Sequence, residues 1–190
     1  DASFGTVSST GTTNASGVAS ATFKAAEKPG TASVSATAGT KSSSGEIVIS
    51  PASTVSIEFK SAVPPVIGLK GAGQTETSVV TFLVKDANGN PVSDGVKVCF
   101  TLKGPGPGAA ITPTEGSTAG FGTPTAGEVE TVLQSGTVPG PARIVATVSD
   151  DGTTCPAPAT STIITESSPV SIGGGVPDLA HFSLSLDIQN

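Results

Sequence analysis

The sequence lacks several residue types that most globular proteins contain. Its 190 residues include no Trp, Tyr or Met and only seven Phe, so Val, Ile, Ala and Leu must fill any hydrophobic core. Sugar-binding sites usually present aromatic platforms, and the lack of Trp and Tyr therefore counts against a carbohydrate ligand. One histidine and two cysteines form no cluster with the ligand spacing of a zinc site.

Charged side chains are also scarce. They make up 13% of the chain, about half of the fraction usual in globular proteins. Nine Lys and Arg against fifteen Asp and Glu give a net charge of −6, and an acidic surface repels phosphate backbones, so nucleic acid is not an expected partner. No apolar run approaches the roughly 20 residues of a membrane helix, and no membrane insertion is expected in this segment. The surface, rich in Thr, Ser and Gly, is typical of secreted repeat proteins.

One strand–turn–strand pattern occurs twice, at a constant offset of 110 residues. Gly17–Phe23 and Pro29–Thr37 form the first copy, and Gly127–Leu133 and Pro139–Thr147 form the second. Apolar residues alternate within each copy, which predicts two strands joined by a Pro-Gly turn. The residues predicted to share the core face are Ala19, Ala21, Phe23, Ala32, Val34 and Ala36 in the first copy and Val129, Thr131, Leu133, Ala142, Ile144 and Ala146 in the second.

Alternating apolar residues predict further strands outside the repeated pattern. They lie around Val55–Phe59, at Val79–Val84, at Val96–Leu102 and near residues 160–165. About seven short strands with no helical period predict an all-β fold, built of immunoglobulin-like β-sandwich repeats in tandem. The Pro/Gly-rich segment Gly104–Thr125 is predicted to be a long irregular loop.

The strand pattern also predicts the domain organisation. Residues 1–50 are expected to be the C-terminal part of one immunoglobulin-like domain, residues 51–166 a complete domain, and residues 167–190 the start of a further one. The last boundary depends on the similarity of Val170–Ile172 to Val55–Ile57. A half-sandwich leaves its apolar face and strand edges open, so we expect a longer polypeptide or, as the less favoured alternative, strands supplied by another chain.

Two blocks of the sequence resemble a known family. The block Val84–Val92, with the sequence VKDANGNPV, resembles the characteristic turn of bacterial immunoglobulin-like domains of the invasin/intimin type, and the repeated strand–turn–strand block is similar to that family too. The resemblance covers residues 51–166 and most of residues 1–50. It implies tandem sandwiches that project from a bacterial surface as a rigid stalk, with any receptor-binding module at the far tip. The 104–125 segment and the two cysteines depart from the family pattern.

The two cysteines, in a chain expected to be secreted, predict a disulfide. Cys99 alternates with Val98 and Phe100 and so faces away from the core, while Cys155 lies in the connection after the strand that ends at Val148. The hypothesis is a bond that ties this connection to the outer face of the neighbouring sheet. Two free thiols are the alternative.

Other candidate sites have plainer interpretations. Asp86, Asn88 and Asn90 resemble the start of a calcium loop, but Lys97 stands where such a loop has its bidentate Glu, and a turn needs these residue types too. His181 and Asp178 have no nucleophile beside them in the sequence, so a packed or solvent-facing histidine is expected. No catalytic, cofactor-binding or metal-binding residue is predicted, and the chain is not expected to be an enzyme.

The expected function is that of a structural or adhesive repeat of a bacterial cell-surface or extracellular protein, acting as a stalk or filament segment. One alternative is a protein-binding module that uses the 104–125 loop, and another is an accessory domain of a secreted enzyme. The expected partners are neighbouring immunoglobulin-like repeats of the same chain, a protein ligand, or further copies of the chain.

Overall fold

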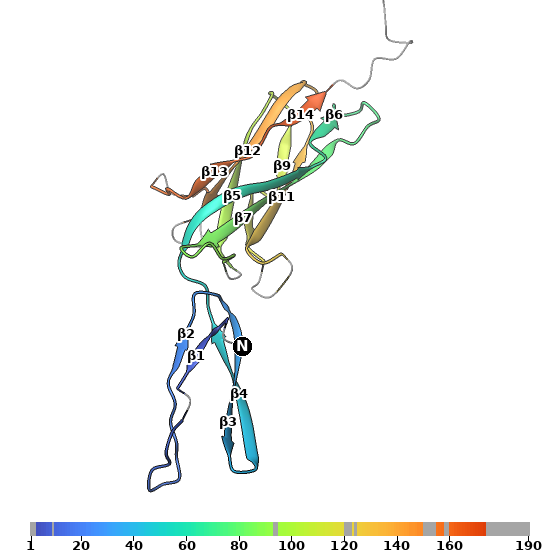
Figure 1. Cartoon of the computed structure of the whole chain (residues 1–190). Coiled ribbons are helices and arrows are strands. Elements are labelled where there is room, and N and C mark those ends of the chain that lie inside the picture. Colours follow the sequence, from blue (N-terminus) through green and yellow to red (C-terminus); the bar gives the residue numbers. More distant parts are fainter. Residues whose placement is uncertain are drawn as a thin grey trace, which may run out of the picture.

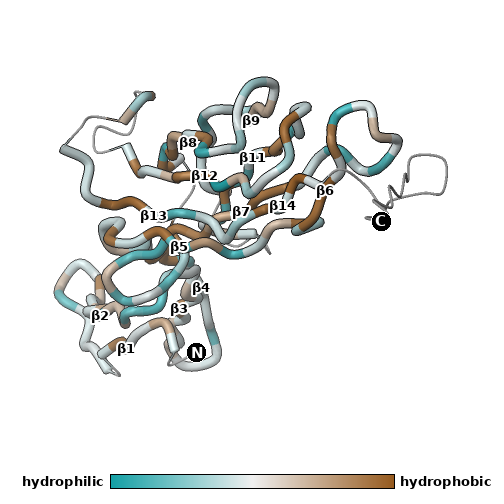
Figure 2. The backbone as a smooth tube through the Cα atoms, turned by 90° about the horizontal axis from the view of Figure 1, so that it is seen from above, coloured by the Kyte–Doolittle hydropathy of each residue, from teal (hydrophilic) through white to brown (hydrophobic). Residues whose placement is uncertain are grey.

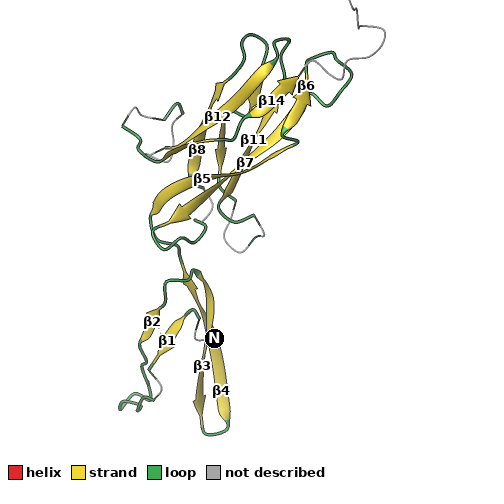
Figure 3. Cartoon of the chain, turned by 45° about the horizontal axis from the view of Figure 1, so that its top comes forward, coloured by secondary structure: helices red, strands yellow, loops and turns green. Residues whose placement is uncertain are grey.

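A computed structural model describes residues 3–8, 10–92, 95–119, 123, 125–149, 155–157 and 160–173. These residues form fourteen strands, which Figure 3 draws in yellow. In this part of the chain no helix is long and apolar enough to cross a membrane. Figure 1 shows two units placed end to end, an N-terminal unit of strands β1–β4 and a central domain of strands β5–β14. The all-β prediction is therefore confirmed.

The N-terminal unit consists of two strand pairs. The strands β1 (Gly5–Val7) and β2 (Phe23–Ala25) are antiparallel, and β3 (Gly30–Ala38) and β4 (Lys41–Ile49) form a hairpin. Gly39, with a φ of 59°, supplies the left-handed conformation that the tight turn between β3 and β4 requires. The strand predicted to follow the Pro-Gly turn of the first copy is thus present.

The strand predicted over Gly17–Phe23 is wrong for most of its length, because β2 begins only at Phe23. Upstream, the Asn14 side chain closes a turn: its Oδ1 accepts the N–H groups of Ser16 and Val18 at 2.9 and 3.0 Å. Such side-chain bonds offer the backbone an alternative to a strand ladder. Val18 is exposed, so this stretch also buries little apolar surface that could favour a strand.

The central domain is a sandwich of two sheets. The first has the order β5 (Thr54–Val63), β7 (Thr77–Asp86), β11 (Glu128–Gln134) and β9 (Ala110–Thr112). The second has the order β10 (Glu115–Ser117), β8 (Lys97–Lys103), β12 (Gly140–Val148), β14 (Val170–Gly173) and β6 (Val66–Gly68), and β13 (Ile164–Glu166) also pairs with β12. All pairs are antiparallel except β14 with β6.

The hydrophobic core lies between the two sheets. The Phe82 ring stacks on the Phe100 ring at 5.8 Å and meets the Phe59 ring edge-on at 6.1 Å, so three rings from three strands join the layers. Figure 2 shows hydrophobic stretches of the chain around β7 and β14. The core faces predicted from alternation are confirmed for the second copy of the repeat, where Val129, Thr131, Leu133, Ala142, Ile144 and Ala146 are all buried.

The segment from Gly104 to Thr125 is not one irregular loop. It contains β9, which extends the first sheet beside β11, and β10, which extends the second sheet beside β8. Each of these strands has only three residues, which is too short for an alternating pattern to be recognised in the sequence. They form because the edges of β11 and β8 offer unpaired backbone groups to the passing chain.

The predicted boundary at residue 166 is too early. Strand β14 pairs with β12 and β6, and Val170 and Ile172 are buried in the core of the central domain. The register gives the reason: Ile172 lies opposite Gly140, just as Ile49 lies opposite Gly30 in the N-terminal unit. Val170–Ile172 therefore corresponds to the end of a domain, as Ile47–Ile49 does, and not to the start that its similarity to Val55–Ile57 indicated. Residues 174–190 lie outside the described residues.

Candidate functional site

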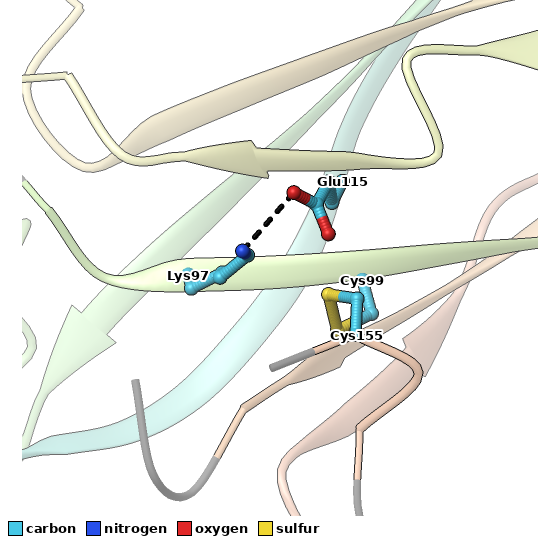
Figure 4. The surroundings of a disulfide bond; sticks show 4 residues. All are labelled: Lys97, Cys99, Glu115 and Cys155. Carbon is cyan, nitrogen blue, oxygen red and sulfur yellow. Dashed lines mark ion pairs between the residues drawn. A yellow bond between two sulfur atoms is a disulfide. The ribbon is translucent and has the colours of Figure 1, made fainter. Parts of the chain in front are cut away.

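The disulfide joins two parts of the central domain that are far apart in the sequence. Cys99, on β8, and Cys155 are bonded across a separation of 56 residues, as Figure 4 shows. Val98 and Phe100 point into the core, so Cys99 lies on the opposite, outer face of the strand, where it is only 6% exposed. The bond therefore fastens the connection between β12 and β13 to the outer face of the sheet.

An ion pair lies beside the disulfide on the same face. Glu115 of β10 is opposite Cys99 in the register, and its Oε1 is 3.0 Å from Lys97 Nζ (Figure 4). Both side chains are partly exposed, so the contribution of the pair to stability is small. Its effect on the surface is to balance one negative charge with one positive charge.

A pocket of about 450 Å³ opens next to the disulfide. Hydroxyl groups and apolar groups line it together, from β8, β10 and β12 on one side and from the tethered connection and the start of β13 on the other. The Ser161 Oγ is buried and has no hydrogen-bond partner among the described residues. The lining residues are Cys99, Phe100, Thr101, Thr114, Glu115, Thr147, Cys155, Pro156, Ala157, Ser161 and Ile164. Such a lining can exchange hydrogen bonds with a ligand and bury a small apolar group.

The N-terminal unit has no such connection at the equivalent position. There β3 and β4 are joined by the tight turn at Gly39, whereas residues 149–163 separate β12 from β13. The pocket-forming connection is thus an insertion in one of two similar hairpins. Sequence analysis missed the pocket because Thr114, Ser161 and Ile164 carry no motif and meet only in the folded sheet.

Asp86 organises the turn between β7 and β8. Its side chain is 2% exposed. Its Oδ1 accepts the N–H groups of Asn88 and Asn90, each at 2.9 Å, and its Oδ2 accepts the N–H of Ala52 at 3.0 Å. Burial by itself raises the pKa of Asp86, but the backbone hydrogen bonds from Asn90, Ala52 and Asn88 outweigh it and hold the pKa below its ordinary value.

This geometry favours the turn interpretation of the Asp86, Asn88 and Asn90 pattern over the calcium loop. Both carboxylate oxygens of Asp86 face N–H donors, whereas a calcium ion needs oxygens that are free to coordinate it. Among the described residues, no group of three or more His, Cys, Asp and Glu side chains could hold a metal ion. His181 and Asp178 lie outside the described residues.

The fold can be compared with solved structures. The chain matches FdeC, an Escherichia coli adhesin, with a TM-score of 0.60 and 18% sequence identity over 93% of this chain and 51% of that chain. The likeness concerns the fold, so the chain shares the all-β architecture of this adhesin structure. The D0-D1 domain of intimin is a weaker match, with a TM-score of 0.40 and 18% sequence identity over 88% of this chain and 75% of that chain. The Yersinia pseudotuberculosis adhesin InvE matches with a TM-score of 0.44 and 16% sequence identity over 89% of this chain and 46% of that chain.

These likenesses describe the fold and no more. The chain spans about half the length of the FdeC structure it matches. No protein-family model matches the sequence, and no curated protein sequence matches it.

Proposed function

We propose that this chain is a stalk segment of an extracellular adhesin at a bacterial cell surface, and that its immunoglobulin-like units hold a binding region away from the cell. The observation that carries the proposal is the path of the chain. In Figure 1 the chain enters the central domain at the end next to the N-terminal unit and leaves β14 at the opposite end. Repeats joined in this way extend along one axis.

The composition and the packing support a passive mechanical role. The central domain has a hydrophobic core between two sheets and a disulfide on one face, features that slow unfolding. The likeness in fold to the adhesin FdeC supports the same role. Residues 1–50 are proposed to be the C-terminal part of a preceding domain, since β3 occupies the position that β12 has in the complete one.

The experiment compares two changes to the full-length protein displayed on its own cells. In one variant residues 54–173 are deleted, and in the other they are replaced by an unrelated immunoglobulin-like domain of similar length. A stalk predicts that adhesion to host cells is retained with the replacement and reduced with the deletion, because only reach is lost. Loss of adhesion in both variants, with normal surface display measured by antibody, would contradict the proposal.

A second candidate function is protein binding at the pocket beside the disulfide. The favouring observation is the buried Ser161 hydroxyl, which has no partner in the described part of the chain, in a pocket to which Thr114 and Glu115 of the 104–125 segment contribute. Thr101→Arg would fill the pocket, and Ser56→Arg, at an exposed position of β5, serves as the control. Binding at the pocket predicts that Thr101→Arg alone abolishes adhesion, and equal adhesion of both variants would exclude it.

A further inference from the structure

The turn between β7 and β8 contacts the part of the chain that precedes the central domain. Asn90 Nδ2 donates a hydrogen bond of 2.9 Å to the carbonyl oxygen of Glu27, in the N-terminal unit. Asp86 Oδ2 accepts the N–H of Ala52, in the link between the two units, at 3.0 Å. One turn of the central domain therefore holds both the preceding unit and the link.

The two sides of this contact differ in chemistry. In these two hydrogen bonds the central domain contributes side chains, the carboxylate of Asp86 and the amide of Asn90, whereas the other side contributes backbone groups, the N–H of Ala52 and the C=O of Glu27. Every residue has a backbone carbonyl and every residue except proline has a backbone N–H. The contact therefore places almost no demand on the sequence of the preceding unit.

The turn is held in shape before it meets its partner. The Asp86 N–H donates to the Asn90 carbonyl at 2.8 Å, and the Gly89 N–H donates to the Asp86 carbonyl at 3.0 Å. Gly89 has a φ of 79°, which a residue with a side chain rarely adopts. A preorganised surface loses little conformational freedom on binding, so a contact with few hydrogen bonds can still fix an orientation.

The carbonyl that Asn90 contacts occupies a position that recurs in the repeat. Glu27 lies three residues before the glycine that starts β3, and Thr137 lies three residues before the glycine that starts β12. Thr137 is exposed. The central domain thus has the same backbone position at its other end, with a different side chain.

We propose that the turn Asp86–Asn90 is the docking site for the preceding immunoglobulin-like repeat and recognises the backbone of that repeat rather than its side chains. The partner is another repeat of the same polypeptide, so the inference rests on the proposed stalk function. Because this contact between repeats recognises backbone groups, repeats of divergent sequence can be joined in one fixed orientation. It explains why Asp and Asn, and not apolar residues, occupy this turn.

The test measures how the two units tumble in solution. Amide ¹⁵N relaxation of the 190-residue chain yields a rotational correlation time for each unit. Asn90→Ala removes the bond to Glu27 and keeps the Asn90 N–H that holds Asp86, and Ala52→Pro removes the N–H in the link. Both are expected to lower the correlation time of the N-terminal unit relative to that of the central domain. Asn88→Ala, at an exposed side chain in the same turn, is the matched control and should cause no change.

Glu27→Ala tests the recognition of backbone directly, because it removes the side chain and leaves the carbonyl. We expect it to leave the joint as rigid as in the unchanged chain. The proposal is wrong if Asn90→Ala leaves the two correlation times unchanged, or if Glu27→Ala loosens the joint as much as Asn90→Ala does. Urea unfolding of the central domain, expected to be the same in Asn90→Ala and Asn88→Ala, separates a loosened joint from a damaged domain.

The joint and the stalk proposal can fail separately. If adhesion requires the surface of the central domain itself, the stalk proposal fails while the effect of Asn90→Ala on tumbling stands. If the units tumble independently in the unchanged chain, the joint proposal fails whatever the adhesion assay shows.

Discussion

Strands β3 and β12 arise from the two copies of one sequence pattern and have the same length, yet their surroundings differ. β12 lies between β8 on one edge and β14 and β13 on the other, and Ile144 in its middle is 1% exposed. Among the described residues β3 pairs with β4 alone, and Val34, the counterpart of Ile144, is only partly buried. The pattern thus sets where a strand forms, and the neighbouring strands set how much that strand buries.

The connections that follow the two strands differ as well. β3 turns directly into β4, whereas β12 is followed by residues 149–163, which carry Cys155. A long connection costs more entropy to order than a tight turn, and the disulfide offsets part of that cost. The tight turn at Gly39 therefore holds β3 and β4 together, whereas a covalent bond holds the connection that follows β12.

The largest expected effect comes from removing that bond. The double substitution Cys99→Ser and Cys155→Ser should lower the free energy of unfolding of the central domain by about 4 kcal/mol in the chain-entropy model for a loop of this length. Urea unfolding followed by circular dichroism measures it. Reductant should destabilise the unchanged chain and leave the double variant unaffected, and equal stability of the two chains would show that the bond does not hold the connection.

The next effect tests the difference in burial between β12 and β3. Ile144→Ala should destabilise the central domain by about 3 kcal/mol, because it leaves a cavity in a core that cannot close around it. Val34→Ala, at the equivalent position of β3, should cost less than about 1 kcal/mol, since solvent already reaches the site. Urea titrations that follow the amide signals of each unit separately provide both values.

Two variants with the same substitution, Ala to Ser, test the same difference in burial between β12 and β3. Ala146→Ser places a hydroxyl in the core, and Ala36→Ser places one at an exposed site. The first should cost about 1–3 kcal/mol because a buried hydroxyl without a partner is penalised, and the second should be nearly neutral. If both substitutions lowered the free energy of unfolding equally, β3 would be as buried as β12.

The smallest effect concerns Asp86 and depends on pH. Its pKa is lower in the folded chain than its ordinary value of 3.8, so the ionised carboxylate stabilises the fold at neutral pH. This stabilisation is fully present above the ordinary pKa and is lost as the pH falls through the lower folded pKa. Asp86→Asn should be less stable than the unchanged chain by about 1–2 kcal/mol at pH 7.

The gap between Asp86→Asn and the unchanged chain should narrow as the pH falls below about 4. Urea midpoints at several pH values between neutrality and pH 2.5 measure it. Asn88→Asp, which adds a carboxylate at an exposed position of the same turn, is the control for the effect of an added charge. A constant gap would exclude the ionised carboxylate as the source of the stabilisation.

Most of the central sandwich could be predicted because its core strands are long and alternate cleanly. Val80, Phe82 and Val84 are all fully buried, as the alternation predicts. Strands β9 and β10 were missed because three residues are too short for a pattern, and their pairing depends on β11 and β8. The sequence of Val170–Ile172 does not show to which domain it belongs, because two alternating apolar residues fit any edge strand of a sandwich equally well.

Some of the candidate sites could be predicted from the sequence and others could not. The Cys99–Cys155 bond could be predicted from the strand phase, which directs Cys99 outward, and from the position of Cys155 in the following connection. The pocket beside the bond could not, because its lining comes from β8, β10, β12, residues 155–157, Ser161 and Ile164. The contact between Asn90 and Glu27 joins residues 63 positions apart through a backbone group, and a backbone group has no sequence signal.

The sequence by itself determined the fold class, the core faces of β7, β11 and β12 and the outward direction of Cys99, because each depends on a period of two along one strand. Tertiary structure decided where the central domain ends, which short segments became strands, and how the turn at Asp86 meets the unit before it. These features depend on strand pairing and on hydrogen bonds of the backbone between residues that are distant in the sequence. Because nearly every residue carries the same backbone N–H and C=O groups, such bonds leave no pattern in the sequence.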